Sequence, residues 1–229
     1  MKRSPAFYRV APFGLYVSFM MLASVLEFLS ARDVALVAQW DLRWLYPIKA
    51  VCVFAALLWC WRHCDELRSF AAVGVRGWAA AIAAGAVVFV VWIALNQSWA
   101  SLGESRGFNP IDATTGSVDG VLVTLRLFGA VLVVPVVEEL FWRSFLLRWL
   151  ERHDFLTVAP AAVGVRAFAI TAVLFAVAHN LWLAGLLAGA VYAGLYMWSR
   201  NLWVPIIAHA VTNGMLGAWV LKTQQWDLW

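Results

Sequence analysis

Residues 131–147 read Val131-Leu-Val-Val-Pro-Val-Val-Glu138-Glu139-Leu-Phe-Trp-Arg143-Ser-Phe-Leu-Leu147, and apart from its charges this stretch is apolar enough to lie in lipid. Each charged side chain near the centre of a membrane helix costs about 2.5–3.5 kcal/mol on insertion scales. Glu138, Glu139 and Arg143 together would therefore cost close to 10 kcal/mol, as a rough sum before any pairing between them. Charges at such a cost are typical of functional sites, so this stretch predicts a site inside a membrane helix.

The composition of the whole chain is that of a membrane protein that crosses the bilayer several times. Of its 229 residues 64% are hydrophobic and only 13% are charged, and 15 are Trp, whereas about half of a soluble domain is apolar. The formal charge of +4 is spread between hydrophobic segments and is not gathered on one surface. This distribution suits membrane topology and argues against nucleic acid as a partner.

The three cysteines, Cys52, Cys60 and Cys64, are too few and too clustered for a disulfide framework. The run Cys60-Trp-Arg-His63-Cys64 contains metal-binding residue types, but it lacks a second ligand pair at zinc-site spacing. Free thiols are therefore the preferred interpretation, and no cofactor or metal is expected.

Hydropathy predicts an all-α bundle of about seven transmembrane segments, with six or eight as alternatives, arranged around an intramembrane cavity. Two segments depart from a simple span, because 120–150 is too long and contains Pro135, whereas 165–179 is too short. We expect one membrane domain, 1–229, with amino-terminal helices in 1–118 and a core in 119–214 that contains the charged stretch. The expected spans are 10–29, 43–62, 78–96, 120–150, 165–179, 182–199 and 203–222.

Charge asymmetry predicts a cytoplasmic amino terminus. With that orientation 11 of the 17 Lys and Arg residues fall on or toward the cytoplasmic side, as the positive-inside rule requires. The first segment, with an apolar length of about 20 residues, fits a retained span better than the shorter core of a signal peptide. We expect a bacterial inner-membrane protein. The 11 residues are Lys2, Arg3, Arg9, Arg62, Arg68, Arg76, Arg143, Arg148, Arg152, Arg166 and Arg200.

The four histidines divide into two classes. His63 and His153 fall in polar connections, whereas His179 and His209 fall inside apolar stretches. A single intramembrane histidine is often a hydrogen-bonding residue between helices. The presence of two such histidines in a chain that also has an intramembrane glutamate pair favours a functional site.

Spacing separates the roles of the two glutamates. Glu139 and Arg143 are four residues apart and share one helix face, so the arginine can neutralise that carboxylate. Glu138 is turned about 100° away from this face. We therefore expect Glu139 to be structural and Glu138 to be available for chemistry.

His209 and Asn213 are also four residues apart and share a helix face. Both side chains can donate hydrogen bonds, so the pair could hold the oxygen of a polarised carbonyl. Phe175 and His179 stand at the same spacing on another segment, where the ring is interpreted as packing.

Three motifs in this order on hydrophobic segments, Glu138-Glu139-x-x-x-Arg143, Phe175-x-x-x-His179 and His209-x-x-x-Asn213, resemble the signature of the CAAX protease and bacteriocin-processing family, which includes the Rce1-type prenyl-protein endopeptidases. The resemblance covers about 119–214, which it implies to be the catalytic core. The more distal part, including Arg9-Val-Ala-Pro-Phe-Gly near the start, also resembles the prokaryotic subgroup associated with exosortase systems.

The resemblance implies an intramembrane glutamate-type endopeptidase whose site is reached from the cytoplasmic side or the membrane. Its substrate would be a membrane-associated or lipidated peptide or protein that is cut near its carboxyl end. By position, Glu138 resembles the water-activating glutamate and His179 its assistant. Glu139 and Arg143 match the supporting acid and base, and His209 and Asn213 match the pair that binds the oxyanion.

Three alternatives remain. Two histidines and a glutamate form a common zinc set in proteases, although the sequence has no His-Glu-x-x-His. Carboxylates and histidines in broken helices also occur in transporters that relay protons. A noncatalytic membrane protein, such as an immunity factor that binds a peptide without cutting it, is the third.

Overall fold

The computed structural model describes residues 4–32, 34, 40–103, 107–112 and 114–229. Within these residues the fold is all-helical, and an isolated bridge between Ile111 and Val118 is the one β feature. The α-helices are α1 (Pro5–Ser30), α2 (Leu45–Trp61), α3 (Val75–Ala94), α4 (Gly120–Phe128), α5 (Val134–Glu139), α6 (Val165–Val177), α7 (Trp182–Ser199) and α8 (Trp203–Thr223). Two π-helical segments, η4 (Gly129–Val133) and η5 (Leu140–Leu147), flank α5. Short 3-10 turns are η1 (Leu42–Trp44), η2 (Asp65–Ala72), η3 (Ser98–Ala100), η6 (Phe155–Thr157), η7 (Pro160–Ala162) and η8 (Trp226–Leu228).

Six helices in the described part of the chain are long and apolar enough to cross a membrane. Long apolar segments become helices in lipid because only internal hydrogen bonds can satisfy their backbone groups there. The protein is therefore an integral membrane protein with a helical bundle, as predicted. The seventh expected span, 165–179, is the short helix α6, which ends at Val177. The six are Pro5–Ser30, Leu42–Trp61, Val75–Ala94, Gly120–Leu147, Trp182–Ser199 and Trp203–Thr223.

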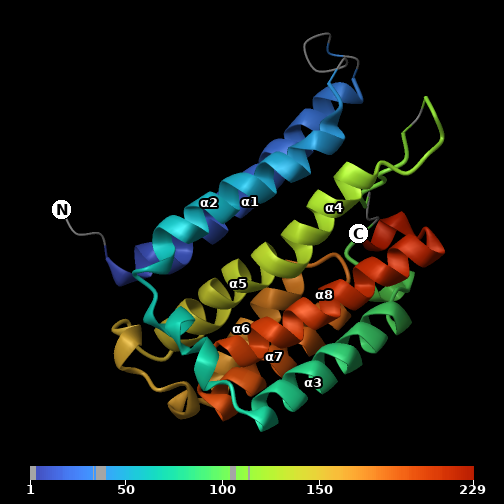
Figure 1. The fold of residues 1–229 in the computed structure, drawn as a ribbon. Helices are drawn as coiled ribbons and strands as arrows, with labels where there is room; N and C mark the ends of the chain where they lie inside the picture. Colours follow the sequence, from blue (N-terminus) through green and yellow to red (C-terminus); the bar gives the residue numbers. More distant parts are fainter. Residues whose placement is uncertain (1–3, 33, 35–39, 104–106, 113) are drawn as a thin grey trace.

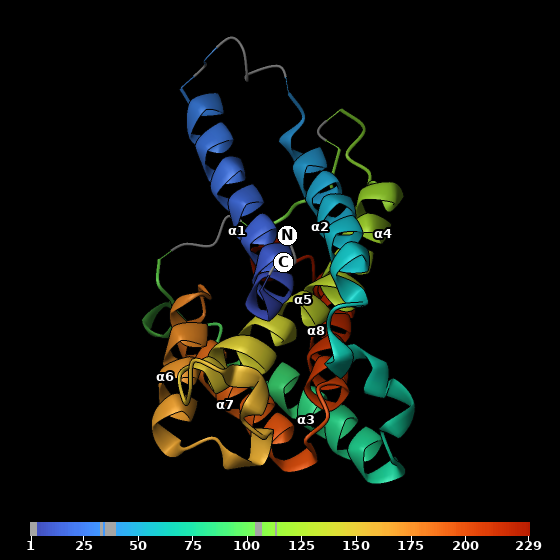
Figure 2. The ribbon, with the colours of Figure 1, turned by 90° about the vertical axis from the view of Figure 1, so that its left-hand side faces the viewer.

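The continuous helix Gly120–Leu147, which comprises α4, η4, α5 and η5, lies at the centre of the bundle (Figure 1). The α1–α2 hairpin covers one side of it, with α2 against α4 and η4 and α1 against α5 and η5. On the other side α3 packs along α8 and α6 packs along α7. In the view turned by 90° the ends of α1 and α2 diverge (Figure 2). The glutamates at the end of α5 therefore lie where both halves of the bundle meet.

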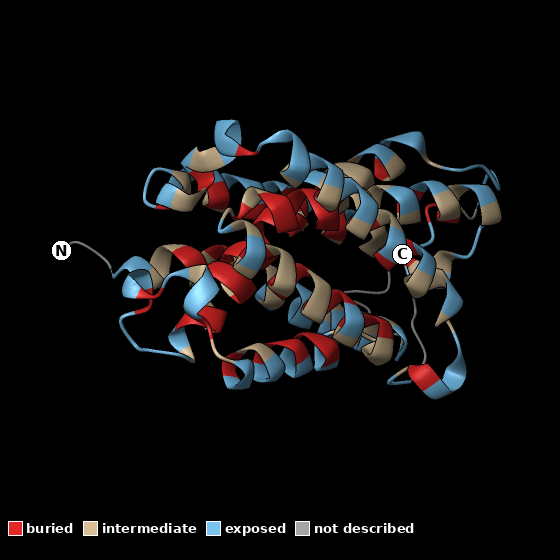
Figure 3. Ribbon diagram, turned by 90° about the horizontal axis from the view of Figure 1, so that it is seen from below, coloured by how far each residue is buried: buried red, intermediate tan, exposed pale blue. Residues whose placement is uncertain are grey.

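Burial is concentrated on the faces that these helices turn toward one another (Figure 3). Large apolar side chains such as Ile82, Val87 and Val90 point outward from α3 and are exposed. In a membrane protein such outward apolar faces are solvated by lipid tails. In α1 only Arg9 and Pro12 are buried.

The two ends of the bundle differ in charge. One end holds the start of α1, the connection from η5 to α6 and the start of α8, whereas the other holds the end of α3, the start of α4 and the carboxyl terminus (Figure 1). Arg152, Arg166 and Arg200 lie at the first end. Lys2 and Arg3, which also support the expected orientation, lie outside the described residues. The cytoplasmic position of the arginine-rich end stays a prediction.

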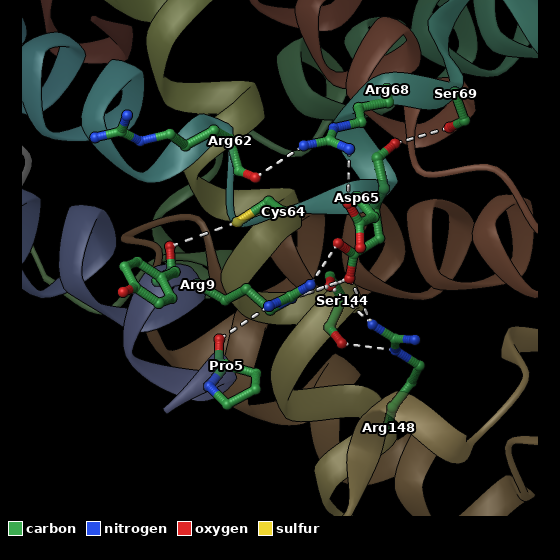
Figure 4. A network of polar contacts seen from close by, with 11 residues as sticks. Pro5, Arg9, Arg62, Cys64, Asp65, Arg68, Ser69, Ser144 and Arg148 are labelled. Carbon is green, nitrogen blue, oxygen red and sulfur yellow. Dashed lines mark hydrogen bonds and ion pairs between the residues drawn. The ribbon is translucent and has the colours of Figure 1, made fainter. Parts of the chain in front are cut away.

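A buried ionic network fastens α1 to the centre of this end. Arg9 of α1 binds Glu66 of η2 with two hydrogen bonds, Nε to Oε1 at 3.0 Å and Nη2 to Oε2 at 2.6 Å. Arg148, just beyond η5, donates from Nη2 to the same Oε1 at 2.8 Å, and the Ser144 hydroxyl donates to it as well. Figure 4 shows Arg9 and Arg148 converging on Ser144 from opposite sides. Because two arginines share one carboxylate, loss of that carboxylate would leave both without their counter-ion.

The network makes the stability of the protein depend on pH. Burial by itself would raise the pKa of Glu66, but the hydrogen bonds and positive charge of Arg9 and the Ser144 hydroxyl outweigh it and hold the pKa below its ordinary value. A carboxyl group with a depressed pKa in the folded state contributes stability above its unfolded pKa, about 4.3. This contribution is lost as the pH falls through the folded pKa.

We predict that Glu66→Gln destabilises the protein by about 3 kcal/mol at pH 7 and removes part of the loss of stability below about pH 4.3. Thermal unfolding in detergent from pH 7 to pH 3 measures both effects. Asp65→Asn is the matched control, because the Asp65 side chain is 86% exposed and pairs with Arg68 at 3.4 Å. Identical pH profiles for the Glu66 variant and the wild type would contradict the proposed stabilisation.

Candidate functional site

Glu138 and Glu139 end α5 and are both buried, with 7% and 0% of their surface exposed. The helix continues beyond them as η5, so they are held in the middle of a membrane-spanning segment and not at its end. Two adjacent carboxylates in this position require partners or contact with water. Their surroundings differ in this respect.

Glu139 is the paired carboxylate. Arg143 Nε lies 3.0 Å from Glu139 Oε2, and His209 Nδ1 lies 3.1 Å from Glu139 Oε1. The Arg143 Nε–H is not aligned with an acceptor, so this contact is an ion pair and not a directed hydrogen bond. Arg143 Nη2 also donates to the Gly189 carbonyl at 3.3 Å. Arg143, four residues further along the same helix, thus neutralises Glu139, and α8 contributes the His209 imidazole as a second partner.

Phe175 lies between the ion pair and the histidines. Its ring is 4.5 Å from the Arg143 guanidinium carbon and 4.4 Å from the His179 ring centroid. Only 1% of Phe175 is exposed. A cation over an aromatic face is attracted by the ring quadrupole. Phe175 therefore packs against both the Arg143 guanidinium and the His179 imidazole and helps to hold them in place.

Glu138 is the unpaired carboxylate. Its Oε2 is buried, and among the described residues no hydrogen bond or ion pair reaches it. One helical turn later, the indole Nε1 of Trp142 is likewise buried and unsatisfied within the described part of the chain. Both side chains line the same hollow. Glu138 is thus a free carboxylate beside a cavity.

The cavity joins the candidate residues from α5, α8 and the end of α6. A space of about 170 Å³ is lined by Glu138, His179, His209 and Asn213, together with Phe175. A neighbouring hollow of about 590 Å³ shares Glu138 and His179 and extends along α1 past Met20 and Met21. Glu139 and Arg143 lie behind this lining. The structure therefore brings all four predicted catalytic residues to one space that has room for water.

His179 lies two residues beyond the end of α6, in a bend, and not inside a span as expected. Its Nδ1 is 2.7 Å from the carbonyl oxygen of Phe175. A carbonyl oxygen can only accept, so Nδ1 carries the proton and the neutral ring has its lone pair on Nε2. The Trp92 ring meets the imidazole edge to face at 5.6 Å. The end of α6 thus fixes the tautomer of a histidine whose Nε2 can accept a hydrogen bond.

His209 is held by two residues that sequence reasoning missed. The Tyr192 ring stacks on the imidazole at 5.0 Å, and the Tyr192 hydroxyl donates to Thr212 Oγ1 at 2.8 Å. Thr212 in turn donates to the Gly85 carbonyl at 2.9 Å. Thr212 is next to Asn213 in the third motif, but Tyr192 lies on a separate helix. No spacing within one segment could have indicated Tyr192.

Asn213 satisfies a carbonyl that the central helix leaves without its regular donor. The Val134 amide donates to Gly129 and not to Ala130, and the next residue, Pro135, has no amide hydrogen. Asn213 Nδ2 donates to the Ala130 carbonyl at 2.7 Å. Pro135 therefore helps to place Asn213 at the cavity, and one amide hydrogen of Asn213 remains for a ligand.

The structure does not assemble a metal centre from the residues it describes, because no group of three or more His, Cys, Asp and Glu side chains converges there. In the run Cys60–Cys64, His63 stacks on Tyr8 at 3.9 Å and Cys64 Sγ lies 3.8 Å from the Tyr8 carbonyl. These contacts are packing contacts. They tie the end of α2 to the start of α1 and lie apart from the residues that line the cavity.

The larger hollow extends toward the end of the bundle that is poor in arginine. Its lining includes Asn96, Arg126 and Leu228, all from that end. With a cytoplasmic amino terminus this end faces outward, whereas the family resemblance implies access from the cytoplasm. The two expectations conflict, and finding out which end of the bundle faces the cytoplasm decides between them.

A membrane bundle that encloses carboxylates, imidazoles and an amide around a small cavity contains the kind of polar cluster that marks an intramembrane functional site. Residues 120–215 match the family described as "Rce1-like: Type II CAAX prenyl endopeptidase Rce1-like". This match covers the part of the chain that carries the site, and the protein is accordingly a peptidase of the CAAX endopeptidase type. No curated protein and no solved structure matches the chain.

We predict that the arginine-rich end is cytoplasmic and the cavity end is external. In a background without the native cysteines, Gln97→Cys should react with a membrane-impermeant maleimide on intact cells, because Gln97 is exposed beside the cavity end. Arg152→Cys, exposed at the other end, is the matched control and should react only after permeabilisation. The reverse pattern would give the protein the opposite orientation and open the cavity to the cytoplasm.

Proposed function

We propose that the protein hydrolyses a peptide bond by direct attack of water, with Glu138 as the general base and without a covalent intermediate. The single observation that carries this proposal is the contrast between the two glutamates, since Glu139 has a cation and an imidazole whereas Glu138 faces the cavity without a partner in the described part of the chain. A carboxylate without an ion-pair partner is free to accept a proton.

In the proposed reaction, Glu138 takes a proton from a water molecule in the cavity while the water oxygen attacks the carbonyl carbon of the substrate. His179 Nε2 accepts a hydrogen bond from the other O–H of that water and so orients it, and this second hydrogen stays on the attacking oxygen. Collapse of the tetrahedral intermediate breaks the carbon–nitrogen bond. The proton held by Glu138 then passes to the departing amine, which regenerates the carboxylate.

His209 and Asn213 stabilise the oxyanion in this proposal. Asn213 has one amide hydrogen beyond the one given to Ala130. His209 donates from Nε2 when its ring is protonated, with Glu139 as the counter-ion at Nδ1.

The substrate is proposed to be a membrane-associated peptide or protein that is cut near its carboxyl end. The larger hollow lies between α1 and residues 178–181 and is lined by Val17, Met20 and Met21 of α1. An apolar opening at membrane depth favours entry of an extended segment from the lipid.

We predict that Glu138→Gln lowers proteolysis by about 10²–10⁴-fold, because a glutamine is close in size but cannot accept the proton. Protein in liposomes is incubated with a degenerate decapeptide pool that carries an amino-terminal acyl chain, and truncated products are counted by mass spectrometry. Incubation with a chelator is added to test the zinc alternative.

Asp154→Asn is the control for loss of a carboxylate, because Asp154 is exposed and its side chain caps no helix. It should retain wild-type cleavage. Equal product formation by the wild type and Glu138→Gln would refute the role of Glu138, whereas loss of wild-type activity on chelation would favour a metal enzyme.

A further inference from the structure

Arg126 is a cation at the cavity to which none of the steps above assigns a role. It belongs to α4 and lines both the small cavity and the larger hollow, together with Glu138. Its Nε is buried without a hydrogen-bond partner, and no ion pair joins its guanidinium to any residue that the structure describes. Arg126 as a whole is half-buried, and an arginine without a counter-ion inside a membrane bundle is costly unless a ligand or water in the cavity solvates it.

Aromatic side chains hold Arg126 in place. Its guanidinium carbon lies 3.9 Å from the Tyr46 ring centroid, 5.1 Å from that of Phe108 and 5.9 Å from that of Trp229. Cation–π attraction to these rings holds the guanidinium beside the cavity, and no residue that the structure describes forms an ion pair with it. The planar fork of donors matches a carboxylate.

Lys49 lies behind the same rings. Its Nζ lies 4.4 Å from the Tyr16 ring centroid and 4.5 Å from that of Tyr46. Lys49 is within electrostatic reach of both Arg126 and Glu138. The cavity therefore has a carboxylate at one end and positive charge at the other, which would align a bound peptide.

We propose that Arg126 binds the carboxyl terminus of the substrate. This inference rests on the proposed function, because it assumes a peptide bound in the same cavity. It makes the enzyme specific for a peptide with a free α-carboxylate whose last residues lie along α4 and α5.

The spacing along the helix limits the length of the released fragment. Arg126 and Glu138 are 12 residues apart, or about 18 Å along an α-helix. An extended peptide spans about 3.3–3.6 Å per residue. The scissile bond is therefore expected within about five residues of the carboxyl terminus, and longer tails should be cut poorly.

Binding to an inactive enzyme tests the carboxylate site separately from catalysis. Glu138→Gln protein in detergent micelles is immobilised and exposed to a degenerate apolar decapeptide pool, synthesised once with free and once with amidated carboxyl termini. The free-acid pool should be retained about 10–100-fold better, as expected of a charge-assisted hydrogen bond. The double variant with Glu138→Gln and Arg126→Gln should lose this preference, whereas the double variant with Glu138→Gln and Arg126→Lys should keep part of it.

Arg76→Gln is the matched control, because Arg76 is exposed at the start of α3, at the other end of the bundle. It should leave the preference unchanged. Thermal unfolding of each variant identifies losses that come from misfolding. Equal retention of the two pools, or a preference that survives Arg126→Gln in a folded protein, would overturn the inference.

The two proposals fail in different ways. If the inactive enzyme prefers the free acid through Arg126 but the wild type cuts no peptide, the carboxylate site stands and the hydrolysis proposal falls. If the wild type cuts acid and amide equally well, hydrolysis stands and the role of Arg126 is refuted.

Discussion

The site depends on the neutralisation of Glu139 inside the bilayer. A carboxylate there is tolerated when a cation is close, and the distances from Glu139 to Arg143 and His209, 3.0 and 3.1 Å, provide one from its own helix and an imidazole from α8. Because Arg143 also reaches the Gly189 carbonyl, the same pair connects α5 and η5 to α7. The ion pair thus joins three membrane helices around one point, and Glu138 is left as the group that can react.

Departures from regular α-helix support this arrangement. The π-helical segment η4 and Pro135 leave the Ala130 carbonyl without its usual donor, and Asn213 supplies one from α8. In the same way, because α6 ends at Val177, the Phe175 carbonyl can accept a hydrogen bond from His179 Nδ1. In both cases a free backbone carbonyl orients a polar side chain at the cavity. Irregular backbone at membrane depth is expected where it is buried in protein or lines a cavity.

The sequence was most informative within single helices. Hydropathy predicted the membrane bundle, and the four-residue spacing of Glu139 and Arg143 predicted an ion pair that the structure contains. Contacts between helices were not predictable from periodicity, because they depend on the packing of distant segments. Tyr192 behind His209 and Glu66 between two arginines are examples. The exact end of α6 was also missed, because the apolar stretch continues to Ala178 although the helix ends at Val177.

The most direct test of the central claim is a double-mutant cycle on the free energy of unfolding in detergent, with Glu139→Gln, Arg143→Met and the double variant. If neutralisation of Glu139 by Arg143 organises the site, each single change should destabilise the protein by about 3–5 kcal/mol. The double variant should recover most of this loss, because neither charge then remains unpaired. Additive losses in the double variant would show that the two charges do not stabilise each other and would contradict the account.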